Sequence, residues 1–393
     1  MQIILDWPDQ VVMGKKGNML WTRLRRAHRV ISTVDSCGGI REDITGFYNH
    51  QSCESDGHSA QAIDNLIARN DELHRQRCHD VGLDPAQTIA MGTAANMNCY
   101  GYAERRWKGL AIAAICTAGV QGNAGCATDK ASVIETEQGY LPLGSADEHR
   151  IGTIVTTVIA NQEFSPAGLT RACVMATEAK VAIMRDLLIG SRYSTRLATG
   201  TGTDQLTIAA PIGAGHPITS PGKHTLAGQL LAEAVYAAIE EALILQNDYS
   251  RPARRKVSAQ LSRFGYTCEK AVEMAASFLD EPTHHLFATN IVSIDSDPET
   301  VAAVSGLVAV VDQIHASILP SSCLGTSVRW AGALIASAAS CSQLSVQQAA
   351  DELSYRLPSM EADDLCRWVV RCLTLGYREK WAFLTRERDR SDG

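Results

Sequence analysis

A threonine–glycine segment that ends in an acid is the first candidate for chemistry. It reads Ala198-Thr199-Gly200-Thr201-Gly202-Thr203-Asp204 and lies between apolar flanks. In an extended chain alternate side chains share a face, which would place the three threonines opposite the two glycines and Asp204. Glycine weakens a strand unless another group must approach its backbone closely. We therefore interpret the segment as a backbone platform with a carboxylate at its end. The structural alternative is a glycine-containing strand that bends beside a neighbour.

A glycine-rich loop is the second candidate. The apolar run that ends at Thr117 continues into Gly119-Val120-Gln121-Gly122-Asn123-Ala124-Gly125. The backbone N–H groups of such loops can hold an anion or a developing oxyanion. Thr117 and Asn123 would add side-chain hydrogen bonds. The alternative is a plain turn.

Two charged groups lie on a helix that we expect between Ser165, a capping residue followed by Pro166, and about Ile189. Helical spacing puts Lys180 on one line with four apolar or small residues, Cys173, Ala176, Ile183 and Leu187. Because this helix is apolar over most of its circumference, a lysine on it needs a partner. Lys180 either forms a structural ion pair with a carboxylate or, like Glu178, faces a substrate.

A pair of potential cations precedes the next predicted helix. Gly222-Lys223-His224 stands directly before Thr225, the expected cap of a helix that reaches about Gln246. The positive end of the helix dipole should lower the pKa of His224 and favour neutral imidazole, which suits a general base. The alternative is a solvated loop. This is no phosphate-binding loop, because His224 stands where that motif needs Ser or Thr.

Metal chemistry is not expected. Asn49-His50 and His58 attract attention, but metal sites need three or four ligands of suitable type. The eleven histidines contain no HxxxH or HExxH spacing. The chain also lacks a GxSxG nucleophile motif and a strand followed by GxGxxG.

Strands and helices alternate in the part of the chain that must position these residues. We expect an α+β fold over residues 1–248, a mixed and largely antiparallel sheet packed with helices, followed by a mostly α-helical domain over 253–386. The predicted strands are 19–22, 29–34, 88–94, 110–117 and 152–159, and a further helix is expected from Ser59 to about Arg77, with Ile63, Leu66, Ile67 and Leu73 on its apolar side.

The polar, proline-containing segment Asn247–Lys256 marks the domain boundary. Beyond it we predict helices over 268–279, 298–319, 328–340, 346–357 and 362–384, and a strand over 285–294. The many small residues between Trp330 and Ala339 permit close helix packing. The second domain could serve as a lid, an oligomer interface or a separate activity, and its sequence favours a packing role.

Composition narrows the class of protein. Hydrophobic residues make up 45% and charged residues 20% of the 393 positions, which is typical of a globular chain with a sizeable core. The net charge of −7 argues against nucleic acid as a partner, since phosphate binding needs a positive face. Twelve scattered cysteines without a CxxC pair indicate free thiols in a reducing compartment. With no signal peptide and no membrane-spanning run, we expect a cytoplasmic protein that does not bind membranes and that can form a homo-oligomer.

Taken together and in this order, seven short blocks resemble the adenosylcobinamide amidohydrolase family (CbiZ) of corrinoid salvage. They extend from Ile31 to about Leu243, and the domain past Ser250 lies outside the resemblance. The blocks are Cys37-Gly38-Gly39, Asn49-His50, Thr117-Ala118-Gly119-Val120 with Asn123-Ala124, Gly152-Thr153-Ile154, Thr177-Glu178-Ala179-Lys180, Ala198 to Asp204, and Gly222-Lys223-His224.

The resemblance implies cleavage of the amide that joins aminopropanol to the corrin ring of adenosylcobinamide, giving adenosylcobyric acid. The corrinoid would be the substrate, so no cofactor is implied. Two departures bear on substrate contacts. The family's Ala-Gly-Asp after Asn-Ala is replaced by Gly125-Cys126-Ala127-Thr128-Asp129, and Val155 stands where the family has an asparagine after Gly-Thr-Ile.

Amide hydrolysis needs an activated nucleophile, a site for the oxyanion and a proton for the leaving amine. Our first hypothesis is water activated by Asp204 or by neutral His224. The oxyanion would bind the N–H groups of the 119–125 loop with Lys223 or Lys180, and Glu178 would orient Lys180. The alternative is a threonine nucleophile, Thr199 or Thr201. The candidate substrate-binding residues are His50, Thr117, Gly119, Asn123, Thr153, Thr199, Gly200, Thr201 and Gly202.

Two other functions fit the same sequence. A corrinoid or tetrapyrrole carrier would keep the pocket without the chemistry. An amidohydrolase for a different substrate would keep the chemistry and change the contacts.

Overall fold

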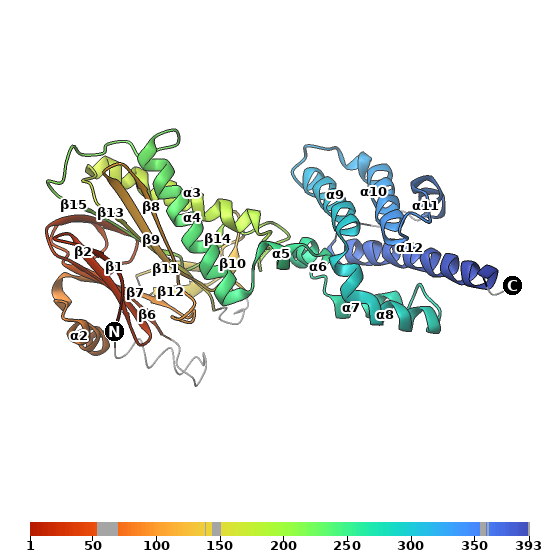
Figure 1. The fold of residues 1–393 in the computed structure, drawn as a ribbon, viewed down its shortest axis with the longest axis horizontal. Helices are drawn as coiled ribbons and strands as arrows, with labels where there is room; N and C mark the ends of the chain where they lie inside the picture. The colour runs from red at the N-terminus through yellow and green to blue at the C-terminus, as the bar shows by residue number, and fades with distance from the viewer. Residues whose placement is uncertain (53–69, 138, 144–150, 354–358, 360, 392–393) are drawn as a thin grey trace. The chain divides into compact units, whose positions relative to one another are not determined.

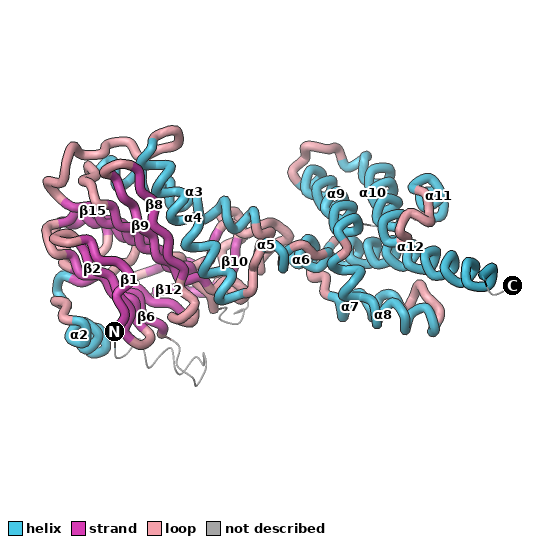
Figure 2. Tube along the Cα trace, viewed as in Figure 1, coloured by secondary structure: helices cyan, strands magenta, loops and turns pink. Residues whose placement is uncertain are grey.

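The structure is a computed structural model that describes residues 1–52, 70–137, 139–143, 151–353, 359 and 361–391. The chain divides between Ser250 and Arg251 into two compact units, Met1–Ser250 and Arg251–Gly393. The first unit combines strands with helices and the second is built of helices (Figures 1 and 2). The α+β class predicted from the sequence is confirmed. Within the described residues, no helix has the length and apolar character needed to cross a bilayer.

A five-stranded sheet forms one half of the frame of the first unit. Its order is β1-β2-β3-β6-β7, and its neighbours run antiparallel except for the parallel pair β6 and β7. The strands are β1 (Gln2–Trp7), β2 (Val11–Lys16), β3 (Met19–Leu24), β6 (Gly46–Gln51) and β7 (Thr88–Thr93).

A six-stranded sheet forms the other half. Its order is β5-β4-β15-β13-β9-β8, again antiparallel except for one parallel pair, β13 and β15. The strands are β4 (His28–Ser32), β5 (Gly39–Arg41), β8 (Gly101–Trp107), β9 (Leu110–Ala118), β13 (Ile154–Ala160) and β15 (Gln205–Pro211). The five strands predicted from the sequence correspond to β3, β4, β7, β9 and β13.

The first unit has four layers. Helix α2 (Asn70–Val81) packs Cys78 and Val81 against Tyr48 on the outer face of the five-stranded sheet. The two sheets face each other across a second core. Helices α3 (Pro166–Asp186) and α4 (Leu226–Asn247) cover the other face of the six-stranded sheet (Figure 1). The predicted helix 59–77 is described only from Asn70 onward, and residues 59–69 lie outside the described residues.

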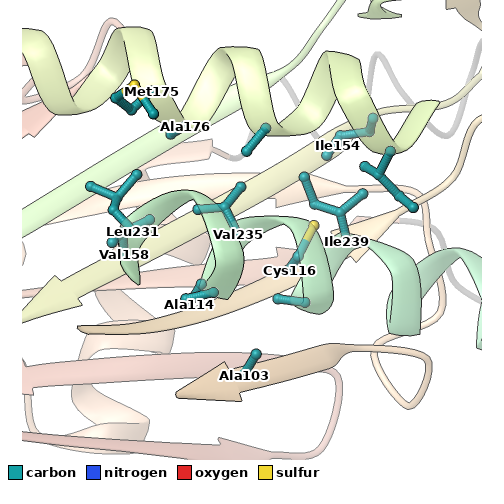
Figure 3. Packing of buried hydrophobic residues seen from close by; sticks show 14 of the residues in the cluster. Ala103, Ala114, Cys116, Ile154, Val158, Met175, Ala176, Leu231, Val235 and Ile239 are labelled. Atoms are coloured by element: carbon teal, nitrogen blue, oxygen red, sulfur yellow. The ribbon is translucent and has the colours of Figure 1, made fainter. Parts of the chain in front are cut away.

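Strand β9 explains why an uninterrupted apolar run forms a strand here. Every residue of β9 is buried, because both faces of the strand are covered. Ala114 and Cys116 join the core under the helices, where Figure 3 shows them beside Val235 of α4. Ala113 and Ile115 point the other way, into the core between the sheets. Successive side chains of β9 therefore enter two different apolar cores in turn, and neither face of the strand needs polar residues.

Helix α3 connects the parallel strands β13 and β15. It begins as the sequence predicted, because the Ser165 hydroxyl accepts a hydrogen bond from the Gly168 N–H and Pro166 occupies the first turn. It ends at Asp186, before the predicted end at about Ile189, since Leu188 adopts a left-handed φ of 53°. Helix α4 begins after its cap Thr225, as predicted.

The second unit is an assembly of helices in which α10 packs against α9, α11 and α12. A Cβ added at Gly332 of α10 would lie 2.9 Å from the Trp368 ring, and one at Gly376 of α12 would lie 2.1 Å from the Ala336 carbonyl. The small residues therefore allow the close packing that the sequence predicted. The helices are α5 (Arg251–Arg254), α6 (Val257–Leu261), α7 (Cys268–Ala275), α8 (Glu281–Ser296), α9 (Pro298–His315), α10 (Leu324–Ala339), α11 (Val346–Glu352) and α12 (Ala362–Ser391), with short 3₁₀ turns at Ser262–Phe264 and Ser321–Cys323, and one in the first unit at Pro85–Gln87.

The predicted strand 285–294 is wrong, because this segment belongs to helix α8. The Asp280 carboxylate caps the helix by accepting a hydrogen bond from the Thr283 N–H at 2.9 Å. Phe287 and Ile291 are buried at a spacing of four, whereas Val292 is 69% exposed. Capping and helical periodicity outweigh the β propensity of the Ile and Val residues.

Candidate active site

The two glycine-rich segments identified in the sequence lie side by side. Strand β10 (Ala124–Gly125) pairs antiparallel with β14 (Gly200–Thr201), and Gly125 lies opposite Gly200. The extended conformation expected up to Asp204 ends at Thr201, because residues 202–203 form a turn. The predicted alternation of faces is therefore wrong beyond Thr201. The turn carries the Asp204 carboxylate back onto β14.

The Asp204 carboxylate is held from three directions. From β14, Thr201 donates to it twice, through its N–H at 3.1 Å and its hydroxyl at 2.6 Å. From β13, the Ile154 N–H donates at 3.2 Å. From α3, the Lys180 ammonium forms an ion pair with it, in which the two side chains are 17% and 18% exposed. These contacts fix the acid at the start of β15, beside its parallel neighbour.

Gly200 is the residue that makes room for this ion pair. A Cβ at Gly200 would lie 2.2 Å from Oδ2 of Asp204 and 2.7 Å from Nζ of Lys180. Both distances are shorter than any van der Waals contact. The interpretation that a group approaches the glycine backbone closely is confirmed, and that group is the Lys180–Asp204 pair.

A cavity of about 170 Å³ opens at this ion pair, between α3 and the six-stranded sheet. The helical line predicted through Cys173, Ala176 and Lys180 faces it. Val174, on another side of α3, is 53% exposed, so the helix is not buried around most of its circumference. The lining residues are Thr33, Ile154, Thr156, Cys173, Ala176, Thr177, Lys180, Asp204, Gln205 and Leu206.

Two thiols near the cavity are poor nucleophiles. Burial raises the pKa of Cys173, which lines the cavity, to about 11. Burial also raises the pKa of Cys116, whose Sγ lies 3.6 Å from the Thr156 hydroxyl, to about 12. Because the thiolate is the reactive form of cysteine, oxygen groups are the better candidates for attack at neutral pH.

The predicted oxyanion loop is used mainly to build the platform. The Gly119 N–H donates to the Thr153 carbonyl at 3.0 Å, so it is not free for an oxyanion. The Asn123 amide donates to the Gly152 carbonyl at 2.9 Å and accepts from the Tyr193 hydroxyl at 2.5 Å. These contacts hold the loop against the start of β13, which is a positioning role.

The hydroxyl groups of Thr199 and Thr201 in the segment, and of Thr153 before β13, make different hydrogen bonds. The Thr199 hydroxyl accepts from the Ala127 N–H at 2.9 Å, so it faces the neighbouring loop. The Thr153 hydroxyl donates to the Thr203 carbonyl at 2.6 Å and supports the turn that precedes Asp204. Gly202 lies in that turn and is exposed. Of the two candidate nucleophiles, Thr201 alone has its hydroxyl bonded to Asp204.

His50 and Thr117, two predicted substrate-binding residues, do not line the cavity that Lys180 and Asp204 line. Thr117 is fully buried and accepts a hydrogen bond from the Asn49 amide at 2.9 Å. His50 lines a different hollow, of about 360 Å³, together with His74 and Arg77 of α2. The alternation along β6 and β9 directs these side chains to layers other than the one that contains Lys180.

Glu178, Lys223 and His224 form a separate surface group. Glu178 was expected to orient Lys180, but its carboxylate pairs with Lys223 at 2.6 Å. The Glu178 and Lys223 side chains are 42% and 64% exposed. His224 is exposed, with a left-handed φ of 69°, and precedes the cap of α4. None of the three lines the cavity at Asp204.

Sequence reasoning missed a cluster that braces the platform. Besides Tyr193, it includes Asp129, whose carboxylate accepts hydrogen bonds from the Ser191 hydroxyl at 2.6 Å and from the Cys126 N–H at 2.7 Å. The one feature of the sequence that pointed to this cluster is that Asp129 ends the segment 125–129, where the chain departs from the family pattern. Tyr193 and Ser191 had no signal. Among the residues described, no cluster of three or more His, Cys, Asp or Glu side chains is suited to a metal ion.

Comparison with known proteins establishes the family. The profile of the adenosylcobinamide amidohydrolase family matches residues 6–251. This match spans more than half of the chain and contains the platform, the ion pair and the cavity. The chain therefore belongs to the adenosylcobinamide amidohydrolase family.

Individual relatives add little about activity. The chain is 29% identical over 181 residues to the uncharacterized protein MJ1613 of Methanocaldococcus jannaschii, covering 45% of this chain and 70% of that protein. A Burkholderia sp. β-aminopeptidase has 15% identity and a TM-score of 0.31, over 60% of this chain and 84% of its own. The PH0078 protein of Pyrococcus horikoshii OT3 has 10% identity and a TM-score of 0.30, over 62% and 82%. At these TM-scores, neither structural likeness bears on fold or function.

Proposed function

We propose that this protein hydrolyses the aminopropanol amide of adenosylcobinamide, or of a related corrinoid, to give adenosylcobyric acid and aminopropanol. The observation that supports it best is the Lys180–Asp204 ion pair, which lines a small cavity inside the region that matches the family. The Asp204 carboxylate also accepts a hydrogen bond from the Thr201 hydroxyl. A carboxylate, an ammonium and a hydroxyl in contact supply a base, a positive charge and an attacking group, which amide hydrolysis requires.

In the first mechanism, water in the cavity attacks the amide carbonyl carbon. Its oxygen forms the new C–O bond while Asp204 accepts the proton, and the Lys180 ammonium stabilises the oxyanion. The C–N bond then breaks, and the proton on Asp204 passes to the leaving aminopropanol nitrogen. We prefer Asp204 to His224 as the base, because His224 is exposed and does not line the cavity.

A second mechanism is favoured by one specific contact, the 2.6 Å hydrogen bond from the Thr201 hydroxyl to Asp204. Here the Thr201 oxygen attacks the amide carbonyl carbon and Asp204 accepts its proton. The C–N bond then breaks, and the proton on Asp204 passes to the leaving aminopropanol nitrogen, giving an ester to Thr201. Water attacks the ester carbon and gives a proton to Asp204, and that proton returns to the Thr201 oxygen as the ester C–O bond breaks. The two mechanisms differ in that only the second predicts an acylated Thr201, which mass spectrometry of protein quenched in acid during turnover would detect.

The test of the activity is direct. The purified full chain is incubated with adenosylcobinamide, and aminopropanol and adenosylcobyric acid are measured by mass spectrometry. The proposal predicts both products in equal amounts with the wild type, and at least about 100-fold less with Asp204→Asn. Binding without product would instead support a corrinoid carrier, and neither binding nor product would support a different substrate. Either result would overturn the proposal.

A further inference from the structure

The cavity that the ion pair lines has a buried floor and an exposed rim. Ile154 and Thr156 of β13 and Ala176 of α3 form the floor, and all three are buried. Thr33 and Thr177 line the cavity from opposite walls, the sheet and α3, and both are exposed. A ligand can therefore enter between these two threonines and lie against a floor that is shielded from water.

The ion pair and Cys173 mark opposite ends of this cavity. Cys173 precedes Lys180 by two helical turns on one face of α3, a rise of about 10 Å, and both line the cavity. Helix α3 runs against the direction of β13 and β15, since it connects these parallel strands. The strand wall therefore advances from Asp204 to Leu206 in the direction that leads along α3 from Lys180 to Cys173.

The volume of the cavity sets the size of its ligand. It measures about 170 Å³. A protein cavity of roughly 150 Å³ accommodates benzene, which has six carbon atoms, so about six or seven non-hydrogen atoms fit here. If the carbon, oxygen and nitrogen of an amide lie at the ion pair, about four atoms remain for the group that extends toward Cys173.

The end of the cavity at Cys173 is uncharged. Among the described residues that line the cavity, only Lys180 and Asp204 carry a charge, and they pair with each other. Burial raises the pKa of Cys173 to about 11, so its thiol is neutral at pH 7. The Thr33 hydroxyl accepts a hydrogen bond from the Leu206 N–H at 3.0 Å and can donate its own proton to a ligand oxygen. A carboxylate or ammonium on the ligand would lose water here without gaining a counter-ion, which is unfavourable.

We infer that Cys173 is a specificity-determining residue, which limits this cavity to amides whose amine part is short and uncharged. The substituent on the amide nitrogen lies between α3 and β15 with its end against Cys173, and the acyl part of the substrate remains outside the rim. Amides whose amine part carries a carboxylate, as peptides do, are excluded. The inference rests on the proposed function for the reacting bond and for the amine as its smaller side.

The experiment changes the size of the cavity at one position. Cys173→Phe fills this end and Cys173→Ala enlarges it. Val174→Phe is the matched control, because it places the same ring on the outside of α3, where Val174 is 53% exposed. Ligand-observed NMR measures the Kd of the full chain for three probes, which are N-(2-hydroxypropyl)acetamide, the longer N-(2-hydroxypentyl)acetamide and the charged N-acetylalanine. The kcat/KM for adenosylcobinamide is measured separately by mass spectrometry.

We expect the wild type to bind N-(2-hydroxypropyl)acetamide at least about tenfold more tightly than N-acetylalanine. Cys173→Phe should raise the Kd for the short neutral amide and lower kcat/KM for adenosylcobinamide, each by about tenfold or more. Cys173→Ala should shift the ratio of the two neutral amides toward the longer one by about threefold or more. Val174→Phe should behave as wild type. A purely structural disturbance would weaken both neutral probes alike and leave their ratio unchanged.

The outcomes separate this inference from the proposed function. If the wild type cleaves adenosylcobinamide and Cys173→Phe matches it in Kd and kcat/KM, the inference is overturned and the function stands. If the wild type does not cleave adenosylcobinamide but binds the short amide in a way that depends on Cys173, the function is overturned and the ligand class stands. If the wild type does not prefer the neutral amide to the charged one, the inference is overturned. Circular dichroism monitors folding, and if Cys173→Phe does not fold, the ratio measured with Cys173→Ala decides.

Discussion

Helix α3 carries two ion pairs whose residues on the helix, Glu178 and Lys180, are two positions apart. In the Glu178–Lys223 pair, the Glu178 side chain is 42% exposed and the Lys223 side chain is 64% exposed. Glu178 belongs to α3, and Lys223 belongs to the loop before α4. The Lys180–Asp204 pair is 17% and 18% exposed, and its carboxylate also accepts three hydrogen bonds from Thr201 and Ile154.

The difference between these pairs lies in their surroundings, since both join a carboxylate to a lysine. Water screens the exposed pair, whose net contribution to folding is about 0–1 kcal/mol. The Lys180–Asp204 pair is mostly shielded from water. Its two charges are therefore stabilised by each other and by the hydrogen-bond donors around Asp204. A functional candidate on this helix is therefore recognised by burial and by additional hydrogen bonds, and the predictions below test that distinction.

The largest effect is expected from breaking the partly buried pair. Asp204→Asn and Lys180→Met should each lower kcat by at least about 100-fold, because a proton acceptor or the oxyanion charge is lost. Each should also lower the free energy of unfolding by up to about 3 kcal/mol, the lower limit for a buried pair, since some of each side chain is exposed. Turnover assays and urea unfolding measure these effects. The double variant Lys180→Met/Asp204→Leu, which leaves no unpaired charge, should recover part of the stability and none of the activity.

A smaller effect is expected at Gly200, which touches both charges without carrying one. Gly200→Ala would place a methyl group 2.2 Å from Asp204 Oδ2, so the ion pair must move. We expect a loss of about 1–3 kcal/mol in unfolding free energy and about tenfold in kcat. Gly306→Ala in α9 is the matched control, because a Cβ there meets nothing within 4 Å. It should stabilise the protein by about 0.5–1 kcal/mol. Equal behaviour of the two variants would contradict the close approach at Gly200.

His50 sharpens the comparison, since it is a partly buried ionisable group with no carboxylate partner among the described residues. Burial, with a contribution from the nearby Arg77 charge, lowers its pKa to about 4. The unfolded chain then binds this proton more readily than the folded chain, so stability is complete above about pH 6.5 and falls as the pH drops toward 4. A shift of this size corresponds to about 3 kcal/mol. We expect a loss of about 1–2 kcal/mol, because the side chain is partly exposed and water screens its charge.

The measurement is urea unfolding from pH 7 to pH 4 for the wild type and His50→Gln. The variant should show a weaker dependence on pH, although some dependence should remain because burial also lowers the pKa of His28. An unchanged pH profile in His50→Gln would show that His50 is not the group responsible.

The smallest effect is expected at the exposed pair. Glu178→Gln and Lys223→Met should each change the free energy of unfolding by less than about 0.5 kcal/mol and kcat by less than about twofold. A loss of activity comparable to that of Asp204→Asn would reverse the comparison and return Glu178 and Lys223 to the catalytic site. Measurements at low and high salt would add a check, because salt screens exposed pairs.

Local signals in the sequence predicted local structure well. Ser165-Pro166 and Thr225 located the starts of α3 and α4, because capping depends on residues within one turn. The glycine at position 200 correctly indicated a close approach. The segment 285–294 was misassigned because its Ile and Val residues favour strands, while the capping Asp280 lay just outside the segment considered.

The sequence could not show which side chains of the site form hydrogen bonds or ion pairs with each other. Asn123 and Tyr193 are 70 residues apart, and their hydrogen bond depends on how the loop and the segment after α3 meet in space. The choice between Asp204 and Glu178 as the partner of Lys180 likewise depends on the turn at residues 202–203. The four layers explain why His50 and Thr117 lie apart from Lys180, because alternation along a strand cannot tell which of two covered faces contains the site.

The parallel pairing of β13 and β15 has a consequence for how the site forms during folding. Lys180 and Asp204 are only 24 residues apart, and both belong to the one connection that links these strands. Closing a loop of this length costs far less entropy than joining the ends of the chain. We therefore expect the charged centre to assemble once a single strand–helix–strand unit has docked, before the five-stranded sheet and the helices beyond Ser250 are complete.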